Sequence, residues 1–188
     1  MNWTIPGTTL TVPRSEAVHI AEQFGSMFFG GGIMLGQVTA ISGLESHMVQ
    51  NWVRRGFLAP PIRKRYDMGQ LCRILTINAL RASLSLESIC SLLQYINGQL
   101  TDHSDDLIND AQLYFMFVRL AARAQQLIQA EDRDRILQEE LSGYEEPLPG
   151  ARERVKTVLS IMLTAYLAAR MREQACQMLK TIEKEKIV

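Results

Sequence analysis

Cysteine and proline are scarce in this chain of 188 residues, which contains only 3 and 6 of them. Cys72, Cys90 and Cys176 lie far apart and form no Cys-x-x-Cys pair, and their number is odd, so we expect no disulfide framework. Small buried side chains in a reducing cytosol are the simpler interpretation of all three. With 47% hydrophobic residues the chain has the composition of a folded protein, which argues against disorder.

Long hydrophobic runs are also missing. The most apolar stretch near the N-terminus, residues 27–35, is too short to cross a bilayer and is broken by Gly30, Gly31 and Gly32. No basic segment followed by an apolar core marks a secretory signal. We therefore expect a cytoplasmic protein without a membrane segment.

Net charge is absent as well, because 20 Lys and Arg balance 20 Asp and Glu. The balance is uneven along the chain, however. Residues 47–83 contain seven cations and only one acid, Asp67, which gives this segment roughly +6 and the remainder roughly −6. The cations are Arg54, Arg55, Arg63, Lys64, Arg65, Arg73 and Arg81. A neutral chain with one basic segment indicates a nucleic-acid contact.

Helical periodicity dominates the rest of the sequence and predicts an all-α protein. The expected helices cover residues 15–29, 35–41, 46–55, 67–82, 85–97, 105–141 and 152–186. Asp67 with Gln70 is typical of a capping box, and Ser85 is a suitable N-cap. The expected organisation is an arm and helix at 1–34, a DNA-binding domain at 35–98 and a helical region at 99–188. Residues 1–14 lack a clear pattern and are expected to be an irregular arm.

The helix at 46–55 has two distinct faces. Leu44, Val49, Trp52 and Val53 are expected to face inward, and Gly43 can supply the positive φ of a helix-turn-helix corner. His47, Gln50, Asn51 and Arg54 then fall on the outer side. Asn and Gln can pair with adenine, and Arg can pair with guanine or phosphate. A solvated polar face is the alternative.

A basic segment follows this helix. Pro60 and Pro61 exclude helix and favour an extended ribbon over residues 62–66. Alternation along such a ribbon would direct Arg63 and Arg65 to one side and Lys64 to the other. Cations in this position would bind backbone phosphate without reading sequence, and their affinity would depend on salt.

Residues 35–97 resemble the winged helix-turn-helix of the MerR family of transcriptional regulators. The matching pieces are LGQVTAISGL, VQNWVRRGFLAPP, KRYD and LSLESICSLLQ. Over residues 15–120 the chain looks more closely like a little-characterised Firmicutes family of unknown function that carries a MerR-like domain. The resemblance implies a DNA-binding regulator whose candidate contact residues are His47, Gln50, Asn51, Arg54, Arg55, Arg63, Lys64 and Arg65. The segment from Pro61 to Tyr66 is shorter than a MerR wing, so we expect a minimal wing and repression of transcription instead of activation.

Other chemistry has little support in the sequence. The triple glycine lacks the Lys-Ser/Thr of a phosphate-binding loop and is interpreted as a hinge. The three histidines lack metal-ligand spacing, and the acidic residues at 102–110 are interpreted as helix-capping charges instead of a cation site. No Ser/His/Asp or Cys/His set indicates an enzyme. We expect no metal, no cofactor and no catalytic activity; whether an effector exists is open.

The C-terminal helix carries an apolar seam from Val155 to Ile182 at three- and four-residue spacing. A helix of this length exceeds the DNA-binding domain, so we expect a homodimer with Val155 to Ile182 in the interface. The alternative function is a helical adaptor that binds another protein through Tyr114, Phe115 and Phe117. A core role for these three aromatics is the competing interpretation.

Overall fold

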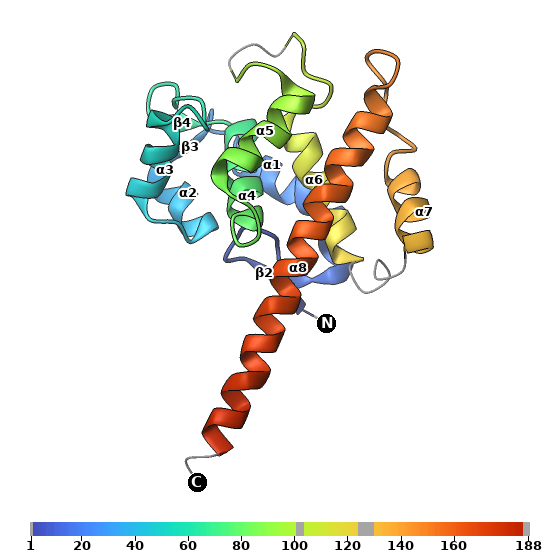
Figure 1. Cartoon of the computed structure of the whole chain (residues 1–188). Coiled ribbons are helices and arrows are strands. Elements are labelled where there is room, and N and C mark those ends of the chain that lie inside the picture. The colour runs from blue at the N-terminus through green and yellow to red at the C-terminus, as the bar shows by residue number, and fades with distance from the viewer. Residues whose placement is uncertain (1, 101–103, 124–129, 186–188) are drawn as a thin grey trace.

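Eight α-helices and two small two-stranded β-sheets make up a computed structural model that describes residues 2–100, 104–123 and 130–185 (Figure 1). The helices are α1 (Ile20–Ser26), α2 (Leu35–Ser42), α3 (Ser46–Arg54), α4 (Met68–Leu80), α5 (Leu86–Asn97), α6 (Asp110–Ala122), α7 (Ala130–Glu140) and α8 (Ala151–Glu185). A 3-10 helix, η1, covers Arg14–Val18. Strand β1 (Asn2–Thr4) pairs antiparallel with β2 (Thr11–Pro13), and β3 (Ile33–Met34) pairs antiparallel with β4 (Arg65–Tyr66). The expectation of a mainly helical chain is confirmed.

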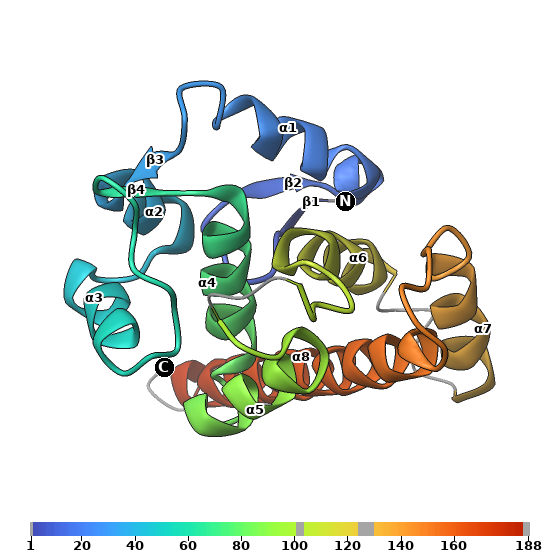
Figure 2. The same cartoon turned by 90° about the horizontal axis from the view of Figure 1, so that it is seen from above.

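Helix α4 is the central element of the fold. Eight of its thirteen residues are buried, including Leu71, Ile74, Leu75 and Ile77, and it contacts α2, α5, α6 and α8. Figure 2 shows it between the α2–α3 pair on one side and α6 and α8 on the other. Because it packs against other helices on several sides, most of its side chains are apolar, and no single polar face is left for solvent. One continuous hydrophobic core therefore joins the N-terminal residues, α4 and α8.

The expected irregular arm is instead a β-hairpin that packs into this core. Trp3 and Ile5 are buried, and the Asn78 amide donates to Gly7 O at 2.9 Å. The Tyr114 hydroxyl donates to Pro6 O at 2.9 Å. Gly7 has φ +74°, and a Cβ there would lie 2.0 Å from the carbonyl oxygen of Leu75. Only glycine lets the hairpin approach α4 so closely.

The single helix expected at 15–29 is wrong, because η1 and α1 replace it. Buried Ala17 and Ile20 are three residues apart, which fits a 3-10 turn, whereas Ile20 and Phe24 are four apart, which fits an α-helix. Val18, an apolar residue between them in the sequence, is 60% exposed. The spacing of the buried residues thus changes within one short segment.

The long helix expected at 105–141 is also divided. The Asn109 side chain accepts from the backbone N of Gln112 at 2.8 Å, so α6 begins at Asp110, and Leu107 and Ile108 are buried ahead of it. Helix α6 ends at Ala122 and α7 begins at Ala130; residues 124–129 lie outside the described part. The two helices pack on each other, and Arg119 pairs with Glu140 at 2.6 Å.

Helix α8 has two halves with different surroundings. Its first half packs against α4, α5, α6 and α7 and buries Val155, Val158, Leu159, Met162 and Leu163. Its second half projects away from the body of the protein (Figure 1). There the large apolar side chains are exposed, from 71% for Met171 to 51% for Ile182. The seam expected to be continuous is therefore covered by the chain's own core up to about Ala165.

Candidate nucleic-acid interface

Helices α2 and α3 meet at a sharp corner. Gly43 ends α2 in the left-handed conformation with φ +69° and ψ +12°, and its N–H donates to Thr39 O at 2.8 Å. A Cβ at this position would lie 2.8 Å from the Thr9 side chain. The corner expected at Gly43 and the helices on both sides of it are confirmed.

The two faces of α3 are also as expected. Val49 and Trp52 are buried and Val53 is half-buried, while His47, Gln50 and Arg54 are exposed and Asn51 is half-buried. None of these four polar side chains makes a hydrogen bond or ion pair with any residue that the structure describes. The outer face of α3 is thus a row of donors and acceptors that are free to meet a ligand.

The prediction of an extended ribbon over residues 62–66 is wrong at Arg63 and Lys64. Ile62 and Arg65 exchange backbone hydrogen bonds of 3.0 and 2.9 Å, so the chain reverses between them. Arg63 and Lys64 form the reversal with φ +49° and +62°, the pattern of a type I′ turn. Both residues therefore lie at the tip of a hairpin, which we call the wing, and not on alternating sides of a strand.

The tip residues are unusual for this turn. Both central positions of a type I′ turn need positive φ and are normally filled by Asn, Asp or Gly. A left-handed backbone costs other residues about 1–2 kcal/mol each. In the part of the chain that the structure describes, Arg63 and Lys64 are the non-glycine residues with positive φ. The two cations thus occupy their positions at a conformational cost.

The five basic candidates differ in how they are held. Arg54, Arg63 and Lys64 are exposed and make no side-chain hydrogen bond or ion pair with the described residues. Arg65 donates to Gly32 O at 2.8 Å. Arg55 pairs with Glu87 of α5 at 2.5 Å and lies 4.5 Å from the centre of the Phe57 ring.

The backbone N–H of Glu87 and the Arg55 guanidinium lower the pKa of the Glu87 carboxyl, so this group is a carboxylate at neutral pH. Arg55 and Arg65 are therefore already engaged within the protein. Arg54, Arg63 and Lys64 are the cations available to an anionic partner.

Helix α3 and the wing share one surface. A shallow pocket of about 450 Å³, here called the helix–wing hollow, is lined by Met34, Leu35, Gly36, Gln50, Val53, Pro61, Lys64 and Tyr66. Gln50 of α3 and Lys64 of the wing thus lie on the rim of the same hollow. Sequence reasoning missed Met34, which is 52% exposed, because a methionine before a helix gives no signal of a surface role.

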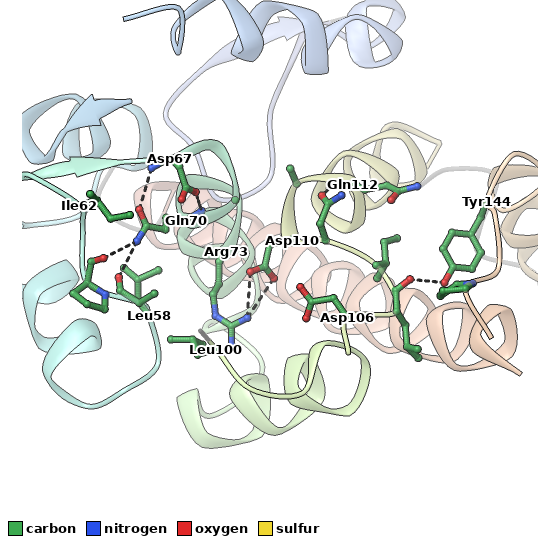
Figure 3. Close-up of a pocket in the computed structure, with 18 of the residues that line it drawn as sticks. Leu58, Ile62, Asp67, Gln70, Arg73, Leu100, Asp106, Asp110, Gln112 and Tyr144 are labelled. Atoms are coloured by element: carbon green, nitrogen blue, oxygen red, sulfur yellow. Dashed lines mark hydrogen bonds and ion pairs between the residues drawn. The ribbon is translucent and has the colours of Figure 1, made fainter. Parts of the chain in front are cut away.

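Side chains of α4 hold the connection between α3 and the wing. Gln70 accepts from the backbone N of Asp67 at 3.0 Å and donates to Ala59 O at 3.1 Å and Pro60 O at 3.0 Å (Figure 3). The predicted capping box at Asp67 and Gln70 is confirmed. The second function of Gln70, which fixes the root of the wing, was not evident from the sequence.

Arg73 is not a surface cation, although its charge contributes to the basic segment. Only 6% of this residue is exposed. Its Nε donates to Phe57 O at 3.0 Å, and its Nη1 lies 3.3 Å from both carboxyl oxygens of Asp110. Asn97 also donates to Asp110 at 3.3 Å. A buried guanidinium needs such a partner, so Asp110 of α6 belongs to the structural support of the wing.

The described residues offer no metal centre and no membrane span. No group of three or more His, Cys, Asp or Glu side chains among them is arranged to hold a metal ion, while Asp102 and His103 lie outside the described part. None of the described helices combines the length and the apolarity that a bilayer crossing requires. Burial raises the pKa of the Cys72 and Cys90 thiols, whereas Cys176 is exposed on α8.

Comparison with known proteins relates the central part of the chain to proteins of unknown function. Residues 34–117 match the family described as "Domain of unknown function (DUF1836)". The "Uncharacterized protein YkrK" of Bacillus subtilis (strain 168) is 28% identical over 86 residues, which are 44% of this chain and 37% of that protein. The match therefore spans little more than a third of the relative's length. No solved structure matches significantly. The chain is thus similar, from α2 through most of α6, to a family of unknown function, in keeping with the expected resemblance to an uncharacterised Firmicutes family.

Proposed function

We propose that the chain binds double-stranded DNA and regulates transcription, with α3 in the major groove and the wing on the adjacent backbone. The observation that carries this proposal is the pair Arg63 and Lys64. Both cations are exposed, unpaired among the described residues and held at positive φ, where Asn and Gly would be more stable. A cost of this kind at the tip of a hairpin is best explained by contact with a polyanion.

The exposed face of α3 supports the same proposal. Gln50 and Asn51 can form paired hydrogen bonds with adenine, and Arg54 can reach guanine or phosphate. Gln50 lines the helix–wing hollow together with Lys64, so one ligand surface can contact both elements. Repression is the simpler regulatory outcome, since bound protein can block a promoter without a sensor or an activating distortion.

The alternative is a protein-interaction adaptor that uses the aromatic residues of α6. Tyr114 and Phe117 have no exposed surface, and Phe115 is 8% exposed. Their rings pack against one another and against Phe24 and Tyr166. The surface on which the adaptor hypothesis depended is therefore part of the core, which favours the DNA proposal.

The test replaces the wing tip by the sequence that a type I′ turn prefers. The double variant Arg63→Asn with Lys64→Gly should fold at least as stably as the wild type, because it removes two strained residues. It should also bind random duplex DNA more weakly and with a flatter salt dependence, by about one unit of slope for each phosphate that the wing no longer neutralises. Fluorescence anisotropy across a salt series measures both quantities. A stabilised variant with unchanged DNA affinity would show that the wing does not contact DNA.

The second partner that we propose is another copy of this chain. Met171, Met178, Leu179 and Ile182 are all more than half exposed on the projecting half of α8. Apolar side chains at this spacing form one stripe of the helix, which a second α8 can cover. The proposed interface is therefore limited to residues 168–182, instead of the full seam from Val155 to Ile182.

A further inference from the structure

One cavity lies between the root of the wing, α4, the start of α6 and residues 144–147. It has a volume of about 800 Å³, within the range of small-molecule sites, and we call it the wing-root cavity. One wall is formed by residues 58–62, a second by α4 from Asp67 to Arg73, and the others by residues 106–112 and 144–147. Figure 3 shows these side chains around a common space.

The walls of this cavity combine apolar surface with an excess of negative charge. Apolar lining residues come from several walls: Leu58, Pro60, Ile62, Leu107, Ile108 and Pro147. Four lining residues are acidic, Asp67, Asp106, Asp110 and Glu145, whereas Arg73 is the one cation among the described lining residues. The charge of Arg73 is already met by Asp110. The lining therefore offers a ligand apolar side chains together with more carboxylates than cations.

We propose that the wing-root cavity binds a small organic cation: an amine with an apolar body. The apolar body is favoured by the lining from residues 58–62 and 107–108, and the ammonium group is favoured by the excess of carboxylates over cations in the walls. An anionic ligand of the same shape is disfavoured, because the guanidinium that would attract it is engaged with Asp110 and Phe57 O.

A ligand in the wing-root cavity should change the position of the wing, because the cavity lies directly beside the segment that carries it. The effect on DNA that we infer from this rests on the proposed DNA-binding function. Gln70 lines the cavity and donates to Ala59 O and Pro60 O. Arg73 lines it as well and donates to Phe57 O. A ligand that contacts Gln70 or presses against Pro60 and Ile62 displaces the segment that carries Arg63 and Lys64. Occupancy should therefore weaken DNA binding.

Three probes with the same apolar body separate the role of charge from that of apolar burial: 4-phenylbutylamine, 4-phenylbutanol and 4-phenylbutyrate. Isothermal titration calorimetry of the full chain without DNA should give saturable binding of the amine, at least about tenfold tighter than binding of the carboxylate. Equal affinity for amine and carboxylate, or no saturable binding of the amine at millimolar concentration, would overturn the proposal.

Variants locate the binding within the cavity. Asp106→Asn with Glu145→Gln should reduce affinity for the amine about tenfold and leave the alcohol unchanged. Glu146→Gln is the matched control, since Glu146 is adjacent in sequence but does not line the cavity. If the double variant does not fold, the variant Ala111→Trp tests the location of the site. Its indole fills the cavity and should abolish binding of both the amine and the alcohol. Retained binding in the folded Ala111→Trp protein would show that the ligand binds outside this cavity.

The coupling is measured separately, by titrating DNA in the presence of saturating amine. We expect DNA affinity to fall at least about threefold, which corresponds to a modest linkage between two sites. Amine binding with unchanged DNA affinity would overturn the coupling alone. Amine binding by a chain that shows no affinity for DNA would reject the proposed function and leave the cavity as a ligand site.

Discussion

Single residues decide how closely the elements of this protein approach one another. Gly7 is the clearest case, because its neighbour is the backbone of α4 and not a side chain that could move aside. We expect Gly7→Ala to lower the free energy of unfolding by about 2 kcal/mol or more, since positive φ and a carbonyl contact both oppose the methyl group. Chemical denaturation followed by circular dichroism measures this change.

Gly25→Ala is the matched control for that substitution. Gly25 lies in α1 with no atom within 4 Å of an added Cβ, so alanine there should be neutral or stabilising by up to about 1 kcal/mol. Equal stability of the two variants would mean that the hairpin does not contact α4 as described.

Substitution of Gln50 is the best test of whether α3 contacts DNA bases or only backbone phosphates. Its side chain is exposed on α3, on the rim of the helix–wing hollow. If DNA is bound as proposed, Gln50→Ala should cost about 1–3 kcal/mol at one position of a selected site and little on random duplex. Competition binding with single-position variants of the selected sequence measures the difference. A uniform decrease in affinity on all duplexes would show that Gln50 contacts the phosphate backbone of the DNA and not a base.

At the scale of elements, the two halves of α8 should respond differently to the same substitution. Met162 and Leu163 are fully buried in the core of one chain. Met162→Asp should therefore destabilise the fold by several kcal/mol, because an unpaired charge would be buried. Met178→Asp, on the projecting half, should leave stability nearly unchanged. Thermal unfolding of the two variants at low protein concentration compares them, and similar melting temperatures would contradict the division of the helix.

The sequence predicted those elements whose ends are set locally. The corner at Gly43, the capping box at Asp67 and Gln70 and the cap at Ser85 each depend on residues within four positions, and all are present. The N-terminal hairpin was missed because Pro6 and Gly7 find their partners at Tyr114 and Asn78. The turn at Arg63 and Lys64 was missed for a different reason, since neither residue favours positive φ.

The sequence predicted only the part of the candidate site that depends on neighbouring residues. Periodicity was sufficient to place His47, Gln50 and Arg54 on the outer face of α3. It could not show that Arg55 pairs with Glu87 or that Arg73 is buried against Asp110, because both partners lie more than thirty residues away in the chain. Counting charge along a segment overestimates the cations available to a ligand when long-range partners are unknown.

At the scale of the whole molecule, the projecting half of α8 should set the oligomeric state. We expect Met171→Asp with Met178→Asp to convert a dimer to a monomer that retains its fold, because these side chains lie on the apolar stripe and outside the core. Sedimentation equilibrium of the full chain measures the mass. Gln177→Asp adds charge to the same half of the helix, outside the stripe of large apolar side chains, and should leave the dimer intact. A wild-type chain that is monomeric at tens of micromolar would contradict the dimer.

The ion pair between Arg73 and Asp110 also limits where the chain can be truncated without loss of its fold. A fragment that stops after α5 would retain the guanidinium in its buried position without the carboxylate that compensates it, and without the acceptor of Asn97. Removing one partner of a buried pair costs about 3–5 kcal/mol, a large share of the stability of a small domain. The family match extends to residue 117 and so includes Asp110. A fragment that carries α3 and the wing and folds by itself should therefore include α6. A fragment cut directly after α5 should be recovered as an insoluble or proteolysed product.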